Sequence, residues 1–240
     1  MKIGLLNACT PAEELEFKTL ELDNFRDFVN LVPNKIEMHD YRITEDDFPN
    51  SPAECDGYII TGSPAGAYDT HPWIPKLSQF IRDTHAAGIK MVGICFGHQI
   101  LAHALGGEAK KSEKGWGMGL REFNLETEER PEWLTLPADN GECNLYFCHQ
   151  DQVVTLPKNA KRLAGSEFCP NAMFTLDDQI LGMQGHPEFT NKTMDVTVDY
   201  FTGKLDDDFI EEVVSTTQTE VNPDDKVAAE WVVNFLGAGV

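Results

Sequence analysis

The sequence has few basic side chains for its length. Its 240 residues include 19 Lys and Arg but 40 Asp and Glu, so the formal net charge at pH 7 is −21. A surface of that sign repels phosphate groups, which argues against nucleic acid and against anionic membranes as partners. The charge says nothing about the fold, and its simplest interpretation is a soluble protein.

Long apolar runs and a regular cysteine framework are also missing. No apolar run approaches the roughly 20 residues that a membrane span needs. The six cysteines are irregularly spaced, and the chain is long enough to bury a core without disulfides. We therefore expect reduced thiols and a cytoplasmic location. There is also no glycine-rich phosphate loop, so we expect no synthetase activity in this chain.

Strand-like and helical patterns alternate over the first half of the chain. The predicted strands are residues 2–7, 35–41, 57–60 and 89–94, and the predicted helices are residues 14–32, 73–87 and 97–105. Such an alternation is typical of an α/β protein with a doubly wound, mostly parallel sheet and helices on both faces.

The pattern changes after residue 115. Short strand candidates follow one another, with Asp177 and Asp178 as a hairpin turn; they are residues 120–125, 144–148, 161–164, 172–176 and 179–183. We expect them to form an antiparallel annex on the same sheet.

The last 50 or so residues are expected to be helical. Residues 222–225 have the cap, proline and acidic side chains of a helix start. Residues 205–225 are acidic and polar, and we expect them to be mobile. Residues 1–203 are expected to form the main domain, with 204–240 as an acidic segment and C-terminal helix packed on it.

The most informative segment ends the predicted strand at residues 89–94. The strand leads into Gly-x-Cys-x-Gly and then a helix, which is the cysteine version of a nucleophile elbow. Gly93 and Gly97 give the tight turn room on either side of Cys95. The helix N-terminus favours the thiolate form of Cys95, and the backbone N–H of Phe96 is placed to donate to an oxyanion.

Other interpretations of this segment stay open at this point. Cys95 could be a buried structural cysteine at the end of a glycine-rich strand. His98 and His103 lie on the helix itself, where we expect the geometry to aim them away from the thiol.

A second signal follows the predicted strand at residues 179–183. His186 comes just past its end, and Pro187 favours an extended backbone at His186. Residues two apart in an extended chain point to the same side, so Glu188 can reach the imidazole. The three side chains then fit a Cys-His-Glu arrangement of nucleophile, base and orienting carboxylate. Taken alone, the segment would be read as a surface turn.

Three motifs together resemble the class I, triad-type glutamine amidotransferase family. They are Gly-Ile-Cys-Phe-Gly-His-Gln at residues 93–99, Gly-His-Pro-Glu at 185–188 and Thr-Gly-Ser-Pro at 61–64. Their order and spacing are similar to that family across residues 3–193. The first two motifs are specific in combination, whereas the third is weak alone.

The resemblance implies a flavodoxin-like fold and a catalytic triad. In this sequence Cys95 would be the nucleophile, His186 the base and Glu188 its partner. The implied substrate is a small molecule with a γ-glutamyl amide bond, and no cofactor is implied.

The resemblance also implies further site residues. The loop at Gly62 and Ser63 would supply the second oxyanion donor, the N–H of Ser63; the family often has Gly-Gly there, but a backbone donor tolerates the change. Gln99 would help to hold glutamine, and His149 and Asp151 would lie near the pocket for its α-amino and α-carboxylate groups. From the residues alone, the segment around His149 is a strand end with polar side chains.

A metal site is not expected. Cys143, Cys148 and His149 could suggest zinc, but no fourth ligand has a suitable spacing.

Three functions remain open from the sequence. The chain could be a glutaminase that passes ammonia to a synthetase in trans, or a stand-alone γ-glutamyl peptidase. It could also be a non-enzymatic regulatory or scaffold protein on this fold. Intact Cys95, His186 and Glu188 argue against the third function.

Overall fold

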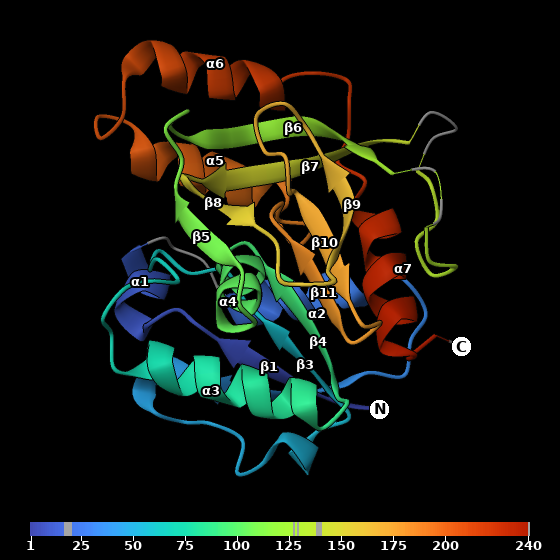
Figure 1. The fold of residues 1–240 in the computed structure, drawn as a ribbon. Coiled ribbons are helices and arrows are strands. Elements are labelled where there is room, and N and C mark those ends of the chain that lie inside the picture. Colours follow the sequence, from blue (N-terminus) through green and yellow to red (C-terminus); the bar gives the residue numbers. More distant parts are fainter. Residues whose placement is uncertain (17–20, 127, 129, 138–140, 240) are drawn as a thin grey trace.

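A nine-stranded sheet with helices on both faces forms the centre of the computed structural model (Figure 1). The structure describes residues 1–16, 21–126, 128, 130–137 and 141–239. The strands are β1 (Lys2–Asn7), β2 (Glu37–Arg42), β3 (Gly57–Ile60), β4 (Lys90–Ile94), β5 (Glu108–Lys111), β6 (Gly117–Leu125), β7 (Glu142–His149), β8 (Asp151–Thr155), β9 (Lys161–Gly165), β10 (Met173–Leu176) and β11 (Ile180–Met183). The helices are α1 (Pro11–Glu16), α2 (Glu21–Val29), α3 (Trp73–Ala86), α4 (Phe96–Ala104), α5 (Asn191–Phe201), α6 (Asp207–Thr217) and α7 (Asp225–Leu236). In these residues no helix has both the length and the hydrophobicity that crossing a bilayer requires.

The strand order confirms the predicted fold class. The sheet runs β2-β1-β3-β4-β11-β10-β9-β6-β7, and its first five strands are parallel. That half has the strand order of flavodoxin-like folds. The remaining strands pair antiparallel and continue the same sheet, as the annex was expected to do. A separate antiparallel pair, β5 with β8, was not predicted.

Side chains of the central strands alternate between two apolar cores. Leu5 and Ile59 pack in one core with α2 and α7, whereas the next residues, Leu6 and Ile60, pack in the other with α3 and α4. Each strand therefore buries both of its faces, as continuous apolar strands of parallel sheets do. A third cluster lies where α5 and α6 cover β6 and β7 (Figure 1).

Most predicted elements appear at the expected places. The strands at residues 2–7 and 57–60 are confirmed as β1 and β3. Asp177 and Asp178 join β10 to β11 with φ angles of 51° and 53°, which fits the left-handed turn of a tight hairpin. The helix predicted at residues 14–32 corresponds to α1 and α2, while its residues 17–20 lie outside the described part of the chain.

The acidic segment at residues 205–225, which we expected to be mobile, contains a helix, as expected for this end of the chain. Asp207–Thr217 forms α6, and the Asp206 carboxylate caps it by accepting the N–H groups of Asp208 and Phe209. Acidic residues in a first turn complement the helix dipole, so they support a helix here. Val213 is buried against β6 and β7.

The C-terminal helix begins later than the sequence predicts. It starts at Asp225, and Asp224 makes no side-chain cap. Asp224 instead binds the edge strand β7, because its carboxylate accepts the N–H of Asn144 at 2.8 Å and its own N–H donates to the Asn144 carbonyl at 2.7 Å. The acidic side chain thus joins α7 to the sheet.

We predict that α7 is part of one folding unit with the sheet. Trp231 is fully buried, and its Nε1–H donates to the Thr135 carbonyl at 2.8 Å. Trp231→Ala should lower the free energy of unfolding by about 3–5 kcal/mol, as large-to-small core changes do. Trp231→Phe should cost less, since it keeps a ring in the site. Chemical denaturation followed by circular dichroism measures both.

The matched control is Val221→Ala, because Val221 is 51% exposed. It should change the free energy of unfolding by less than about 0.5 kcal/mol. An early transition that involves only helical signal, with the rest of the protein intact, would show instead that the C-terminal region unfolds independently.

Candidate active site

The carboxyl ends of three neighbouring parallel strands meet at one edge of the sheet. Thr61 follows β3, Cys95 follows β4, and His186 comes shortly after β11. Two backbone hydrogen bonds connect them: Cys95 donates to the Met183 carbonyl at 2.8 Å, and Gly97 donates to the Thr61 carbonyl at 3.1 Å. The fold therefore brings together three motifs that are far apart in the sequence, at the place where α/β sheets bind ligands.

The backbone at Cys95 is strained. Its φ and ψ are 53° and −104°, a conformation that L-residues rarely adopt. A Cβ on Gly93 would lie 2.3 Å from the carbonyl carbon and oxygen of Gly97, and a Cβ on Gly97 would lie 2.3 Å from the Ile60 oxygen. Neither glycine has room for a side chain. The strand, strained turn and helix of a nucleophile elbow are thus present.

The loop after β3 is held by its own hydrogen bonds. The Gly62 carbonyl accepts the hydroxyl of Thr61 at 2.9 Å and the thiol of Cys9 at 3.6 Å. The Ser63 Oγ accepts the N–H of Ala65 at 3.2 Å. These bonds hold the loop in one conformation and leave its Ser63 N–H group without a protein acceptor.

Two backbone N–H groups, one in the loop after β3 and one in the residue after Cys95, are available as donors. Within the described residues, the N–H groups of Ser63 and Phe96 donate to no protein acceptor. Phe96 is the first residue of α4, where helical N–H groups have no intrahelical partner. Cys95 is 5% exposed, and its Sγ lies 3.9 Å from the Cys148 carbonyl oxygen.

His186 and Glu188 form a buried pair. The distance from Nδ1 to Oε1 is 2.7 Å, and the two residues are 5% and 3% exposed. The His186 N–H donates to the Tyr146 carbonyl at 2.7 Å, which fixes the backbone to β7. The Phe189 ring stacks on the imidazole, with centroids 4.1 Å apart. The His186 imidazole and the Glu188 carboxylate are therefore held in place by contacts on several sides.

The charges around His186 favour its protonated form. Burial by itself lowers the pKa of His186, but the carboxylate of Glu188 and the negative charge of Cys95 outweigh it and hold that pKa well above 6.5. Nε2 has no partner of normal hydrogen-bond geometry among the described residues.

Gln99, His149 and Asp151 converge as well. Gln99 donates its amide to the Asp151 carbonyl at 2.9 Å and to Gln184 Oε1 at 3.2 Å. Nδ1 of His149 lies 2.9 Å from the same Asp151 carbonyl. The backbone of Asp151 therefore links α4 to the end of β7.

The side chain of Asp151 faces the loop after β3. Tyr68, on that loop, hydrogen-bonds the Asp151 carboxylate, and burial raises the pKa of Asp151 above its ordinary value. The sequence analysis missed Tyr68, Gln184 and Phe189. Only Phe189 had a signal, since it directly follows the motif at Glu188.

The other histidines in this region are poor bases. Burial lowers the pKa of His98 to about 3 and that of His149 to about 4. His98 is fully buried, with its ring centroid 5.1 Å from that of Phe174. His186 is the histidine whose surroundings support a positive charge.

Three other thiols are kept neutral by their surroundings. Burial raises the pKa values of Cys143, Cys148 and Cys169, which keeps these thiols protonated. In the described part of the chain, no group of three or more His, Cys, Asp and Glu side chains is arranged to hold a metal ion.

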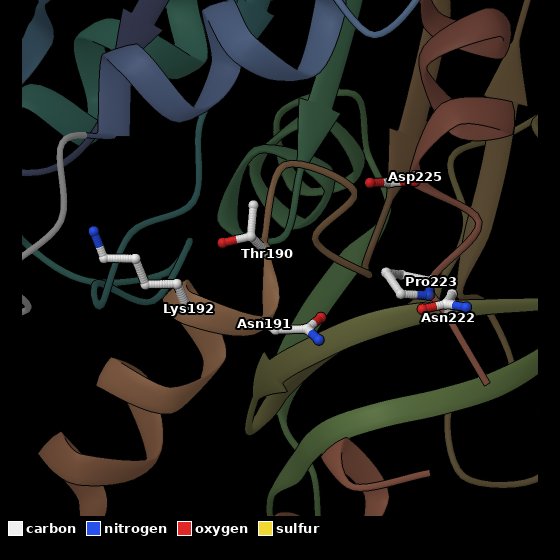
Figure 2. A pocket seen from close by; sticks show the side chains of 6 residues that line it. All are labelled: Thr190, Asn191, Lys192, Asn222, Pro223 and Asp225. Atoms are coloured by element: carbon white, nitrogen blue, oxygen red, sulfur yellow. The ribbon is translucent and has the colours of Figure 1, made fainter. Parts of the chain in front are cut away.

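Two pockets lie near these elements. Figure 2 shows one of about 400 Å³ between the start of α5 and the segment leading into α7; its lining includes Thr190, Asn222 and Asp225 but none of the predicted site residues. The other, of about 340 Å³, is lined by residues of β6 and β7 and by the segment that joins β9 to β10.

Comparison with known proteins identifies relatives along most of the chain. The family model for glutamine amidotransferase class-I matches residues 22–200. Gamma-glutamyl peptidase 3 of Arabidopsis thaliana is 32% identical over 230 residues, which cover 88% of each protein. Gamma-glutamyl peptidase 4 of the same plant is 34% identical over 189 residues, covering 77% of this chain and 75% of the relative.

A solved structure agrees with the fold. A glutamine amidotransferase of Thermotoga maritima superposes with a TM-score of 0.76 over 98% of both chains, at 19% sequence identity. At that identity the likeness concerns the fold alone. The family model, which spans well over half of the sequence, confirms the resemblance carried by the three motifs. This chain belongs to the class I glutamine amidotransferase family.

Proposed function

We propose that the chain hydrolyses γ-glutamyl amide bonds, with Cys95 as nucleophile, His186 as acid and base, and Glu188 as the carboxylate that orients His186. The observation that carries this proposal is the strained Cys95 beside a buried His–Glu pair. Strain and buried charge both cost free energy, and they persist together where function requires them.

The first half of the reaction forms a thioester. The Cys95 thiolate attacks the γ-carboxamide carbon, and the carbonyl electrons move to oxygen. The N–H groups of Phe96 and Ser63 stabilise the oxyanion. When the oxyanion collapses, the C–N bond breaks, and the His186 imidazolium gives its proton to the leaving amine.

The second half releases glutamate. His186, now neutral, takes a proton from water as the water oxygen attacks the thioester carbonyl. Collapse of this second intermediate breaks the C–S bond and returns Cys95 as the thiolate. Glu188 stabilises the imidazolium that results, which restores the starting state without a cofactor.

Recognition of the glutamyl end is assigned to Gln99, His149 and Asp151. Support for this assignment comes from Asp151, whose carboxylate faces the loop that also carries Ser63. A carboxylate suits an α-amino group, and Tyr68 can orient it. Substrates that lack the α-amino group would not pair with the Asp151 carboxylate, so they should bind more weakly.

A stand-alone peptidase is the favoured form of this activity. Relatives named gamma-glutamyl peptidase match along 77–88% of the chain. The second candidate is a glutaminase that supplies ammonia to a synthetase in trans, which family membership supports. Turnover by the isolated protein separates them, because a peptidase needs no partner.

We predict that Cys95 is the thiol required for turnover. Cys95→Ala should abolish hydrolysis, because no other cysteine sits on an elbow. The matched control is Cys143→Ala, since Cys143 is equally buried but lies beside Asp224. Mass spectrometry after treatment with a glutamine-like electrophile should find the label on Cys95 alone. Continued turnover by Cys95→Ala would contradict the mechanism.

The raised pKa of His186 predicts a pH dependence. Acylation needs the imidazolium, so the alkaline limb of kcat/KM should lie well above pH 6.5. Glu188→Gln removes a negative charge that raises this pKa, so the limb should move to lower pH. His186→Ala should lose roughly 10²–10⁴-fold in rate at every pH.

The measurement is kcat/KM from about pH 5 to 10 for the wild type and both variants. Asp56→Asn is a control for removing a carboxylate elsewhere, since Asp56 accepts the N–H of Lys2 near the start of the chain. An alkaline limb that stays in place in Glu188→Gln would show that Glu188 does not set the protonation of His186.

A substrate comparison tests glutamyl recognition. We expect a γ-glutamyl peptide to be the better substrate, glutamine to be turned over more slowly, and a simple acyl amide to be rejected. An anionic peptide must approach a chain of net charge −21, so added salt should raise its kcat/KM or leave it unchanged. Equal rates on the acyl amide would show a general amidase instead.

A further inference from the structure

The loop after β3 is fixed at both of its ends. At its start, the Thr61 carbonyl accepts the N–H of Gly97 at 3.1 Å. At its end, Trp73 begins α3, and its ring packs edge to face against that of Phe96, with centroids 5.4 Å apart. Both contacts are made with the first turn of α4. The segment between them includes Ser63, whose N–H is the proposed oxyanion donor.

The middle of this loop consists of two tight turns. Ser63 Oγ accepts the N–H of Ala65 at 3.2 Å. The Gly66 N–H donates to the Asp69 carboxylate at 2.8 Å, and the Asp69 N–H donates back to the Gly66 carbonyl at 3.0 Å. Tyr68 lies inside the second turn. A contact that holds Tyr68 therefore also restrains the short segment that leads back to Ser63.

Tyr68 meets Asp151 beside Gly66. A Cβ on Gly66 would lie 3.1 Å from Cζ of Tyr68 and 3.2 Å from Oδ2 of Asp151, so the phenol end of the ring and the carboxylate lie close to the same point. Burial and the hydrogen bond to Asp151 raise the pKa of Tyr68 to about 12, so the hydroxyl stays protonated and donates to the carboxylate. Tyr68 is 45% exposed, so this contact can open without disrupting an apolar core.

Asp151 is connected to the nucleophile by a short series of hydrogen bonds. Its carbonyl accepts the side-chain amide of Gln99 at 2.9 Å, and the backbone N–H of Gln99 donates to the Cys95 carbonyl at 3.1 Å. The same Asp151 carbonyl lies 2.9 Å from Nδ1 of His149. Through Tyr68 and Asp151, the middle of the loop is therefore attached to the turn that carries Cys95.

We propose that Tyr68 is a positioning residue that latches the loop carrying Ser63 to Asp151. The inference rests on the proposed function, in which Asp151 receives the α-amino group and the Ser63 N–H stabilises the oxyanion. One hydrogen bond then serves both tasks, because it keeps the carboxylate ionised and aimed while it restrains the oxyanion donor relative to Cys95. Substrate recognition and oxyanion stabilisation are thus coupled through a side chain that takes no part in bond breaking.

The charges that face Asp151 make its ionisation depend on Tyr68. Burial and the carboxylate of Asp69 raise the pKa of Asp151, whereas the Tyr68 hydroxyl and Lys111 on β5 lower it. His149 adds no charge there, since burial lowers its pKa to about 4. Tyr68→Phe removes a group that favours the carboxylate, so the pKa of Asp151 should rise. Binding needs the carboxylate, so the activity that is lost on acidification should be lost at a higher pH in this variant.

The kinetic experiment compares the wild type with Tyr68→Phe, Asp151→Asn and the double variant, with glutamine and γ-glutamylglycine as substrates. In Tyr68→Phe we expect kcat/KM to fall about 10- to 100-fold, the size of a hydrogen bond to a charged group, with a lower kcat as well as a higher KM. The double variant should be no slower than Asp151→Asn, because the hydroxyl acts through Asp151. The matched control is Tyr41→Phe, since Tyr41, on the edge strand β2, donates to the Glu54 carboxylate at 2.9 Å. This control should keep wild-type kinetics.

Two measurements test the latch without turnover. Amide hydrogen exchange at Gly66 and Asp69 should be faster in Tyr68→Phe and in Asp151→Asn than in the wild type, and unchanged in Tyr41→Phe. Carboxyl ¹³C NMR follows the titration of Asp151, whose signal is identified by its loss in Asp151→Asn. The pKa of Asp151 should be higher in Tyr68→Phe than in the wild type.

The outcomes separate the latch from the proposed function. If Tyr68→Phe changes KM alone and its loop amides exchange as in the wild type, the latch is wrong while the proposed function stands. Additive losses in the double variant would also overturn the latch, because Tyr68 would then act independently of Asp151. If Asp151→Asn fails to fold, kcat and amide exchange in Tyr68→Phe decide. If no γ-glutamyl compound is cleaved, the proposed function fails, and exchange decides the latch by itself: faster exchange in Tyr68→Phe supports it, and unchanged exchange overturns it.

Discussion

The left-handed backbone at Cys95 is the constraint on which the surrounding structure depends. A residue in such a region costs of order 1–3 kcal/mol and persists only when its neighbours over-determine it. Here the N–H of Cys95 is bound to β11, and the next turn of chain is bound to the loop after β3 through Gly97. Gly93 and Gly97 meet with no room for a Cβ, so strand β4 and helix α4 approach as closely as backbones allow. Contacts with three strands, β3, β4 and β11, thus hold Cys95 in its strained conformation.

Buried charge in this region also lowers the stability of the folded protein. A buried ion pair seldom repays the loss of hydration, and it does so only when its remaining polar atoms are satisfied. The His186–Glu188 pair does not meet this condition. Oε2 of Glu188 and Nε2 of His186 are buried without a hydrogen-bond partner of normal geometry among the described residues. This ion pair therefore does not stabilise the fold. The rest of the fold, with two apolar cores on opposite faces of the sheet, has to supply the free energy that keeps it in place.

Local rules explain what could be predicted from the sequence. The elbow was predictable because a strand, two glycines around Cys95 and a helix follow one another directly in the sequence. The turn at Asp177 and Asp178 was predictable because aspartate tolerates a positive φ angle. The small sheet of β5 and β8 was not predictable from the sequence. Strand β5 is exposed apart from Ala109, and it pairs with a strand about 40 residues further along the chain. Residues 207–217 were expected to be helical, but the bounds of α6 could not be predicted, because the capping contacts of Asp206 with Asp208 and Phe209 appear only in the structure. Asp224 was expected in the first turn of the last helix, whereas it precedes that helix and its carboxylate binds Asn144, in a distant strand that the local sequence does not reveal.

The position of Arg121 likewise could not be predicted from the sequence. On β6 its sequence context, between Leu120 and Glu122, is that of an ordinary half-exposed strand residue, and only tertiary structure sets it against Phe168. Arg121 is a cation in a chain whose net charge is −21. A net charge of −21 offers no long-range attraction to an anionic peptide, and salt screens what repulsion remains within about 10 Å. If the proposed substrate is an anionic peptide, its selection has to come from short-range contacts, because the surface charge of the chain opposes its approach. A positively charged group within a negatively charged protein selects an anionic ligand through shape complementarity and hydrogen bonds. It does not raise the association rate of that ligand above the rate of unassisted diffusion.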